Sequence, residues 1–91
     1  MKQSMTNYNL AKNYLDEEKT EWKPMRDGAG IGIGELGEEK EDVVVLAADT
    51  ARSSRAKYFA EKFPERFIQC GVQEQNMVGV SAGLAYQGKV P

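Results

Sequence analysis

Two acidic side chains follow the two main apolar stretches of the sequence, and they are the first candidates for chemistry. Asp49 comes two alanines after the run Val43–Leu46, and Glu74 follows the segment RFIQCG. Carboxyl groups of this kind serve in proton transfer when they face a ligand. The alternative is structural, because Asp49 can cap a turn and a first-turn acid such as Glu74 stabilises a helix dipole by about 0.3–1 kcal/mol. When Asp49 and Glu74 are considered one at a time, the structural interpretation is favoured over a catalytic one.

Composition excludes several other kinds of site. The chain has no histidine and a single cysteine, Cys70, so its own residues cannot form an ordinary zinc site, a Ser-His-Asp triad or an internal disulfide. The 12 basic residues are scattered among 14 acidic ones, which argues against a nucleic-acid partner. The apolar runs are too short to span a bilayer, so we expect a cytoplasmic protein without a membrane partner.

The segment GAGIGIGELG contains the spacing G-x-G-x-x-G at Gly32, Gly34 and Gly37, which resembles a pyrophosphate-binding loop. That motif needs a strand before it and a helix after it, and no strand-like run precedes these glycines. We therefore reject the phosphate-loop interpretation. The same segment predicts a helix with Asp27 as a possible N-cap, whose glycines mark either close packing against a neighbour or a helix that is stable only with tertiary contacts. Its apolar stripe consists of Ala29, Ile33 and Leu36.

The elements that must position the two carboxylates alternate between strands and helices. Short strands are expected at Val43–Leu46 and over RFIQCG, with a third beginning at Val90. A helix over RAKYFAEKF, which Ser53 and Ser54 can cap and Pro64 ends, separates the first two strands. A last helix begins after Gln73 and finishes at Gly88. Its aligned apolar residues are Met77, Val80 and Leu84, and those of the preceding helix are Ala56, Phe59, Ala60 and Phe63.

This order predicts an α/β fold, a partial three-layer αβα arrangement with a parallel sheet and a thin core. Ligands of such sheets bind beyond the carboxyl ends of the strands, where AADTARSS and CGVQEQN lie. We divide the chain into a polar N-terminal extension, residues 1–23, and a domain, residues 24–91. Within the extension, Leu10, Tyr14 and Leu15 allow a short surface helix, and a mobile tail is an equal alternative.

The segments DVVVLAADTARSSRAKYFAEKFPERF and RFIQCGVQEQNMVGVSAGLAYQGKVP resemble the pyrimidine-binding domain of transketolases. The similarity is greatest to the C-terminal subunit of the split form, and it covers residues 24–91. The most specific part is G-V-x-E-Q-N-M followed by A-G-L-A. Related thiamine diphosphate enzymes, such as deoxyxylulose phosphate synthase, share the E-Q pair, whereas Asn76 and Met77 favour transketolase.

The resemblance implies a role for each candidate residue. Glu74 matches the glutamate that hydrogen-bonds N1′ of the aminopyrimidine ring of thiamine diphosphate and activates the cofactor. Asp49 matches an aspartate at the strand end close to the thiazolium ring. Arg26 and Ser53 match positions that bind the phosphate of a sugar phosphate substrate. Thr50 departs from the leucine that many members have after the aspartate, so a cofactor contact at that position is in doubt.

The resemblance also implies what must come from outside these residues. The diphosphate and its Mg²⁺ are held by a GDG-type loop of a separate domain, which this sequence lacks. We therefore expect part of a transferase that moves a two-carbon ketol unit between sugar phosphates, truncated and inactive alone, with a transketolase N-terminal subunit as partner in an oligomer. The alternatives are a docking module without catalysis, a fragment of another thiamine diphosphate enzyme, and a free-standing α/β protein with an unrelated role.

Overall fold

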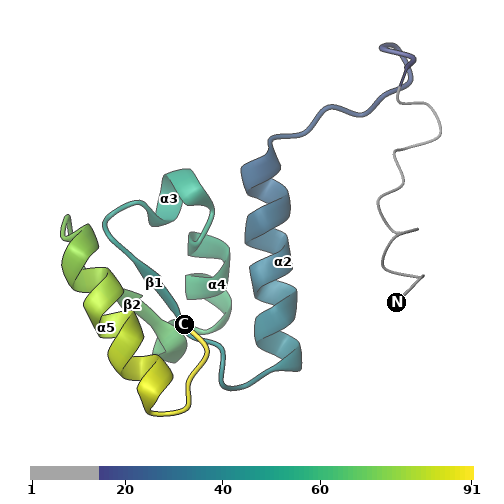
Figure 1. Ribbon diagram of the computed structural model, residues 1–91. Helices are drawn as coiled ribbons and strands as arrows, with labels where there is room; N and C mark the ends of the chain where they lie inside the picture. Colours follow the sequence, from purple (N-terminus) through teal and green to yellow (C-terminus); the bar gives the residue numbers. More distant parts are fainter. Residues whose placement is uncertain (1–14) are drawn as a thin grey trace.

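A computed structural model describes residues 15–91 as a small α/β unit preceded by an extended segment (Figure 1). Residues 15–23 contain a turn in which the N–H of Thr20 donates to the carbonyl oxygen of Asp16 at 2.9 Å. The prediction for Leu10 and Tyr14 lies outside the described residues. In chain order the elements are α2 (Met25–Glu39), β1 (Val45–Ala47), α3 (Ala51–Ser54), α4 (Lys57–Lys62), the 3-10 helix η1 (Pro64–Arg66), β2 (Phe67–Gln69) and α5 (Glu74–Tyr86).

The two strands pair in parallel, as the sequence predicts, with Val45 opposite Phe67 and Ala47 opposite Gln69. Helix α5 covers one face of the strands, and α4 and α2 lie on the other side (Figure 1). The predicted third strand is present as a single parallel bridge between Val90 and Val43. The structure therefore confirms an α/β fold with the opening units of an αβα sandwich.

Helix α2 packs through its glycines. The buried positions of α2 are Gly30, Gly34 and Gly37, spaced so that they share one face. A Cβ added at Gly37 would lie 2.6 Å from Cε2 of Phe59, so the bare backbone of α2 rests on the aromatic side chains of the α4 segment. The predicted close packing is confirmed for Gly30, Gly34 and Gly37, whereas a Cβ at Gly28 or Gly32 would meet nothing within 4 Å. The place of these glycines inside a helix agrees with the rejection of a phosphate loop.

Two details of the predicted α2 were wrong. The apolar stripe is not the buried face, because Ala29 and Leu36 are exposed and Ile33 is half-buried. Asp27 is not the N-cap, since Pro24 occupies that position and no side chain caps the helix. A search for apolar side chains does not count glycine as a buried position. It therefore missed the buried face of α2, where glycines let the helix backbone contact its neighbours directly.

The single helix predicted between the strands is two short helices. Arg55 has a left-handed backbone (φ 67°) and ends α3, and α4 then begins at Lys57. The prediction that Ser53 caps the following helix was wrong, because its hydroxyl donates back to the carbonyl oxygen of Thr50 at 3.2 Å. Ser54 also donates to Thr50, and its oxygen accepts the N–H of Ala56 at 3.4 Å.

Helix α5 ends where the sequence predicts. Gly88 adopts φ 94°, its N–H donates to Ala85, and the N–H of Lys89 donates to Leu84, the two hydrogen bonds of a Schellman motif. This turn sends the chain back to β1, where Val90 accepts the N–H of Val44 at 3.0 Å. The glycine thus connects the end of α5 to the sheet.

The core is thin, and Phe59 is the one large side chain fully buried in residues 15–91. Its other buried members are Val43, Val44, Ala47, Ala48 and Ala56. The ring of Phe59 lies 5.0 Å from that of Phe63, measured between centroids. None of the helices in this part of the chain is long and apolar enough to cross a membrane.

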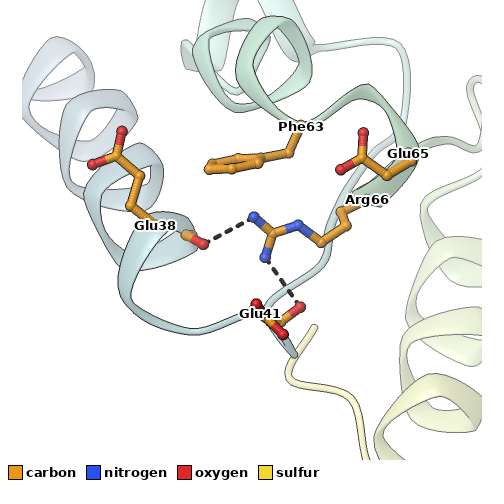
Figure 2. Close-up of a pocket in the computed structure, with 6 residues that line it drawn as sticks. Glu38, Glu41, Phe63, Glu65 and Arg66 are labelled. Carbon is orange, nitrogen blue, oxygen red and sulfur yellow. Dashed lines mark hydrogen bonds between the residues drawn. The ribbon is translucent and has the colours of Figure 1, made fainter.

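Arg66 braces the end of the molecule where the strands begin. Its guanidinium lies 3.9 Å above the ring of Phe63, and Figure 2 shows it between that ring and the backbone of Glu41. The guanidinium donates to the carbonyl oxygens of four residues. The acceptors are Gly37 at 2.8 Å, Lys40 and Glu41 at 3.0 Å each, and Val43 at 3.3 Å. The open hollow beside it has the exposed Glu38, Glu41 and Glu65 on its rim. Because its donors are engaged by backbone, we interpret this arginine as structural.

Candidate functional site

The two candidate carboxylates lie at the opposite end of the molecule from Arg66, at the carboxyl edge of the strands. Asp49 follows β1 after one residue, and Glu74 is the first residue of α5, which follows β2 after a short loop. Both side chains are exposed. Because parallel strands end on the same edge, the structure brings the two loops that carry these residues side by side.

Gln69, the last residue of β2, joins the two loops. Its side-chain Oε1 accepts the backbone N–H of Asp49 at 2.7 Å and that of Gly71 at 3.1 Å. Both donors belong to residues with left-handed backbones, φ 64° at Asp49 and φ 73° at Gly71. One amide oxygen therefore holds the turn after β1 and the turn that leads into α5.

Glu74 stands at the rim of an open polar hollow at the start of α5. The residues that line it are Gln73, Glu74, Gln75 and Asn76. Within residues 15–91 the Glu74 carboxylate has no hydrogen-bond or ion-pair partner, so its oxygens are available to a ligand donor or proton. The side-chain amides beside it add both donors and acceptors.

Arg26 and Ser53 lie on neighbouring elements at the same end of the molecule, where α2 begins and α3 lies (Figure 1). Both are exposed. An ion pair between the residues beside them joins the two helices, because Nε of Arg55 donates to Oδ1 of Asp27 at 2.6 Å. This hydrogen bond raises the pKa of Arg55 above its ordinary value.

Gly30 allows this approach between α2 and the α3–α4 junction. A Cβ at Gly30 would lie 2.6 Å from Cβ of Arg55 and 2.8 Å from its carbonyl oxygen. The first turns of α2 are thus held against residue 55 by a close backbone approach as well as by the ion pair. The four candidate residues consequently form two linked pairs, with Gln69 tying the loops of Asp49 and Glu74, and Asp27 with Arg55 tying the helices of Arg26 and Ser53.

The left-handed backbone of Asp49 leads to a testable expectation. A side chain in this conformation costs about 1–2 kcal/mol, less for aspartate, and glycine avoids the cost while gaining freedom when unfolded. We expect Asp49→Gly to raise the free energy of unfolding by about 0.5–1 kcal/mol in urea titrations. Asp49→Ala removes the same carboxylate but keeps Cβ, so a stability gain of equal size in that variant would contradict the strain explanation.

Sequence reasoning missed the residues that hold the site together. Gln69, Asp27 and Arg55 had no predicted role in linking these loops and helices. Each makes a hydrogen bond to a residue at least 20 positions away in sequence. One signal was available for Gln69, a polar amide that ends an otherwise apolar strand. The ion pair depends on the break at Arg55, which no local pattern predicts.

Comparison with known families decides the relationship. Residues 23–91 match the family described as "Transketolase, pyrimidine binding domain". This chain belongs to that family. The match covers every helix and strand described in residues 15–91, so the transketolase resemblance found in the sequence is confirmed.

Two curated transketolase relatives and one solved structure illustrate the similarity. A protein of Methanocaldococcus jannaschii, inferred to be a transketolase C-terminal section, is 51% identical over 69 residues, which are 76% of this chain and 22% of that protein. The 6-deoxy-6-sulfo-D-fructose transketolase subunit of a Clostridium species is 40% identical over 75 residues, 82% of this chain and 23% of the subunit.

The solved structure is titled a split gene transketolase, inactive beta4 tetramer. It is 47% identical to this chain and superposes with a TM-score of 0.64, over 72% of this chain and 22% of that one. The present chain therefore spans about a fifth of the length of these three proteins. These comparisons establish the family and the fold of the matched residues of this chain.

Proposed function

We propose that this chain supplies one side of a thiamine diphosphate site for ketol transfer between sugar phosphates, as part of a transketolase C-terminal subunit. The observation that carries the proposal is the Glu74 carboxylate, exposed and without a partner in residues 15–91, at the carboxyl edge of a transketolase-family sheet. Thiamine diphosphate, when bound, supplies the chemistry of breaking and forming the bond to the transferred unit.

The residues at this edge fit the aminopyrimidine end of the cofactor. Glu74 can hold a proton at a ring nitrogen, and the amides of Gln73 and Asn76 on the same hollow can meet other polar atoms of the ring. Asp49 lies on the adjacent loop, which Gln69 ties to that of Glu74, and would face the positively charged thiazolium ring. The protein's task in this assignment is to place carboxyl groups.

Arg26 and Ser53 are proposed to bind the phosphate of the substrate. A guanidinium fork and a hydroxyl are suitable donors for phosphate oxygens. Both residues are exposed at the same end of the molecule, and the Asp27–Arg55 ion pair fixes their helices relative to one another. No direct contact between the two residues is needed, because a phosphate group can accept from both.

The diphosphate and Mg²⁺ are proposed to bind a transketolase N-terminal subunit in an oligomer with this chain. The exposure of Glu74 supports this division, because a carboxylate that binds the cofactor here would need a partner surface to cover it. We assign residues 24–91 to the pyrimidine-binding domain and residues 1–23 to a polar extension outside it. We propose the cytoplasm as its location.

The proposal is tested by calorimetric titration of thiamine diphosphate with Mg²⁺. The chain is titrated alone and then mixed with a transketolase N-terminal subunit. We expect binding in the mixture that exceeds binding by either component, and a loss of at least tenfold in affinity for Glu74→Ala. Gln87→Ala is the matched control, because Gln87 is an exposed polar residue at the other end of α5.

Absence of binding in the mixture would contradict a cofactor role for this chain. A second candidate function is then a docking module for the N-terminal subunit without catalysis. The apolar groove between α2, β1 and α5, which includes Leu36, Met77 and Val90, favours this alternative. Co-elution of the two proteins without cofactor binding would support it.

A further inference from the structure

At the carboxyl edge of the sheet, the loops after β1 and β2 are linked by side-chain hydrogen bonds as well as by the backbone. The parallel ladder ends with Ala47 opposite Gln69, and the last backbone bond runs from the N–H of Cys70 to the carbonyl oxygen of Ala47 at 2.8 Å. Beyond this bond the chain leaves β1 toward α3 and leaves β2 toward α5. Without another tie, the two loops would be free to separate.

We propose that Gln69 is a positioning residue that sets the separation of Asp49 and Glu74 at the cofactor edge. Its Oε1 accepts from Asp49 on one loop and from Gly71 on the other. This role rests on the proposed function, since it concerns the two residues assigned to thiamine diphosphate. Gln69 itself contacts no reacting atom and acts through the loops that it holds.

A short series of hydrogen bonds connects the Gln69 side chain to the start of α5, where Glu74 lies. Gln69 fixes the N–H of Gly71, and the carbonyl oxygen of Gly71 accepts the N–H of Gln73 at 2.8 Å. The carbonyl oxygen of Gln73 then accepts the N–H of Met77 at 2.9 Å and so starts α5, of which Glu74 is the first residue. The direction in which α5 presents its first turn therefore depends on the Gly71 turn.

On the loop after β1, the hydrogen bond to Gln69 stabilises a left-handed backbone conformation at Asp49. Asp49 has φ 64°, a conformation that costs energy for a residue with a side chain and persists when the surroundings stabilise it. The hydrogen bond from its N–H to Gln69, at 2.7 Å, supplies that stabilisation.

Amide hydrogen exchange measured by NMR tests the two hydrogen bonds to Gln69 directly. We expect Gln69→Leu to accelerate exchange at Asp49 and Gly71 at least tenfold, because leucine has similar size but no acceptor. Gln69→Glu retains acceptor oxygens and should keep both exchange rates within threefold of the wild type. The amide of Phe63, which donates to Phe59 at 2.8 Å, reports that the variants are folded.

Cofactor binding tests the positioning role. In the mixture with a transketolase N-terminal subunit, we expect Gln69→Leu to bind thiamine diphosphate with Mg²⁺ at least tenfold more weakly, and Gln69→Glu to restore binding. Gln87→Leu is the matched control, since Gln87 is also exposed but lies at the far end of α5.

The outcomes separate this inference from the function on which it rests. Unchanged exchange rates at Asp49 and Gly71 in Gln69→Leu would contradict the claim that Gln69 links the two loops by hydrogen bonds. Accelerated exchange with wild-type affinity for thiamine diphosphate would overturn the positioning role and leave the proposed function intact. No binding by the wild-type mixture would overturn the proposed function and the positioning role with it, while the exchange rates would still report the hydrogen bonds.

Discussion

Replacing Arg66 with alanine is expected to lower the free energy of unfolding by about 2–4 kcal/mol. The substitution removes a charged donor to four carbonyl oxygens, and hydrogen bonds to charged groups contribute about 1.5–3 kcal/mol each when they are shielded from water. It also removes the guanidinium that lies over the ring of Phe63. Because several of these carbonyls are near solvent, we expect part of the sum and not all of it.

Urea titration followed by circular dichroism measures this loss. Arg52→Ala is the matched control, since Arg52 is an exposed arginine of α3, and it should change stability by less than about 0.5 kcal/mol. Arg66→Lys should recover a minority of the lost stability, because an ammonium group lacks the planar fork that reaches several carbonyls at once. Equal stability of Arg66→Ala and Arg52→Ala would refute a bracing role.

Gly37→Ala is expected to destabilise the protein by about 1–3 kcal/mol, although alanine is the better helix former. The added Cβ would lie 2.6 Å from Cε2 of Phe59 and 2.8 Å from Cε2 of Phe63, and the fully buried ring of Phe59 has no space to retreat without moving the core. Helix α2 would have to shift away from α4. Near-ultraviolet circular dichroism and urea titration together report the loss of aromatic packing and of stability.

Gly32 provides the control on the same helix. A Cβ at this position meets nothing within 4 Å, so Gly32→Ala should stabilise the protein by about 0.5–1 kcal/mol through helix propensity alone. The two substitutions are chemically identical and differ in the face of α2 that they occupy. A stabilising effect from both would show that α2 does not rest on the aromatic rings.

The element order and the parallel sheet were predictable because they depend on local patterns. The β-branched run at Val43–Leu46 predicts a buried strand, although the structure begins β1 at Val45. Gly88 predicts the end of α5, since a left-handed residue there completes the Schellman motif. The placement of Asp49 and Glu74 on one edge followed from the topology, because parallel strands end together.

The remaining features depend on contacts that a linear pattern does not contain. The left-handed Arg55, which divides the predicted helix in two, is stabilised by an ion pair to Asp27 on α2. The buried face of α2 consists of glycines, which a search for apolar side chains passes over. Likewise the amide of Gln69 gains its role only after β1 and β2 are paired.

The bridge between Val43 and Val90 has a consequence for the order of folding. Two backbone hydrogen bonds support it, from Val44 to Val90 and from Val90 to Asp42, and the chain between contains every described element from β1 to α5. Closing so long a loop costs entropy that two hydrogen bonds barely offset. The bridge should therefore form last and open first, by a local fluctuation that leaves β1 and β2 paired.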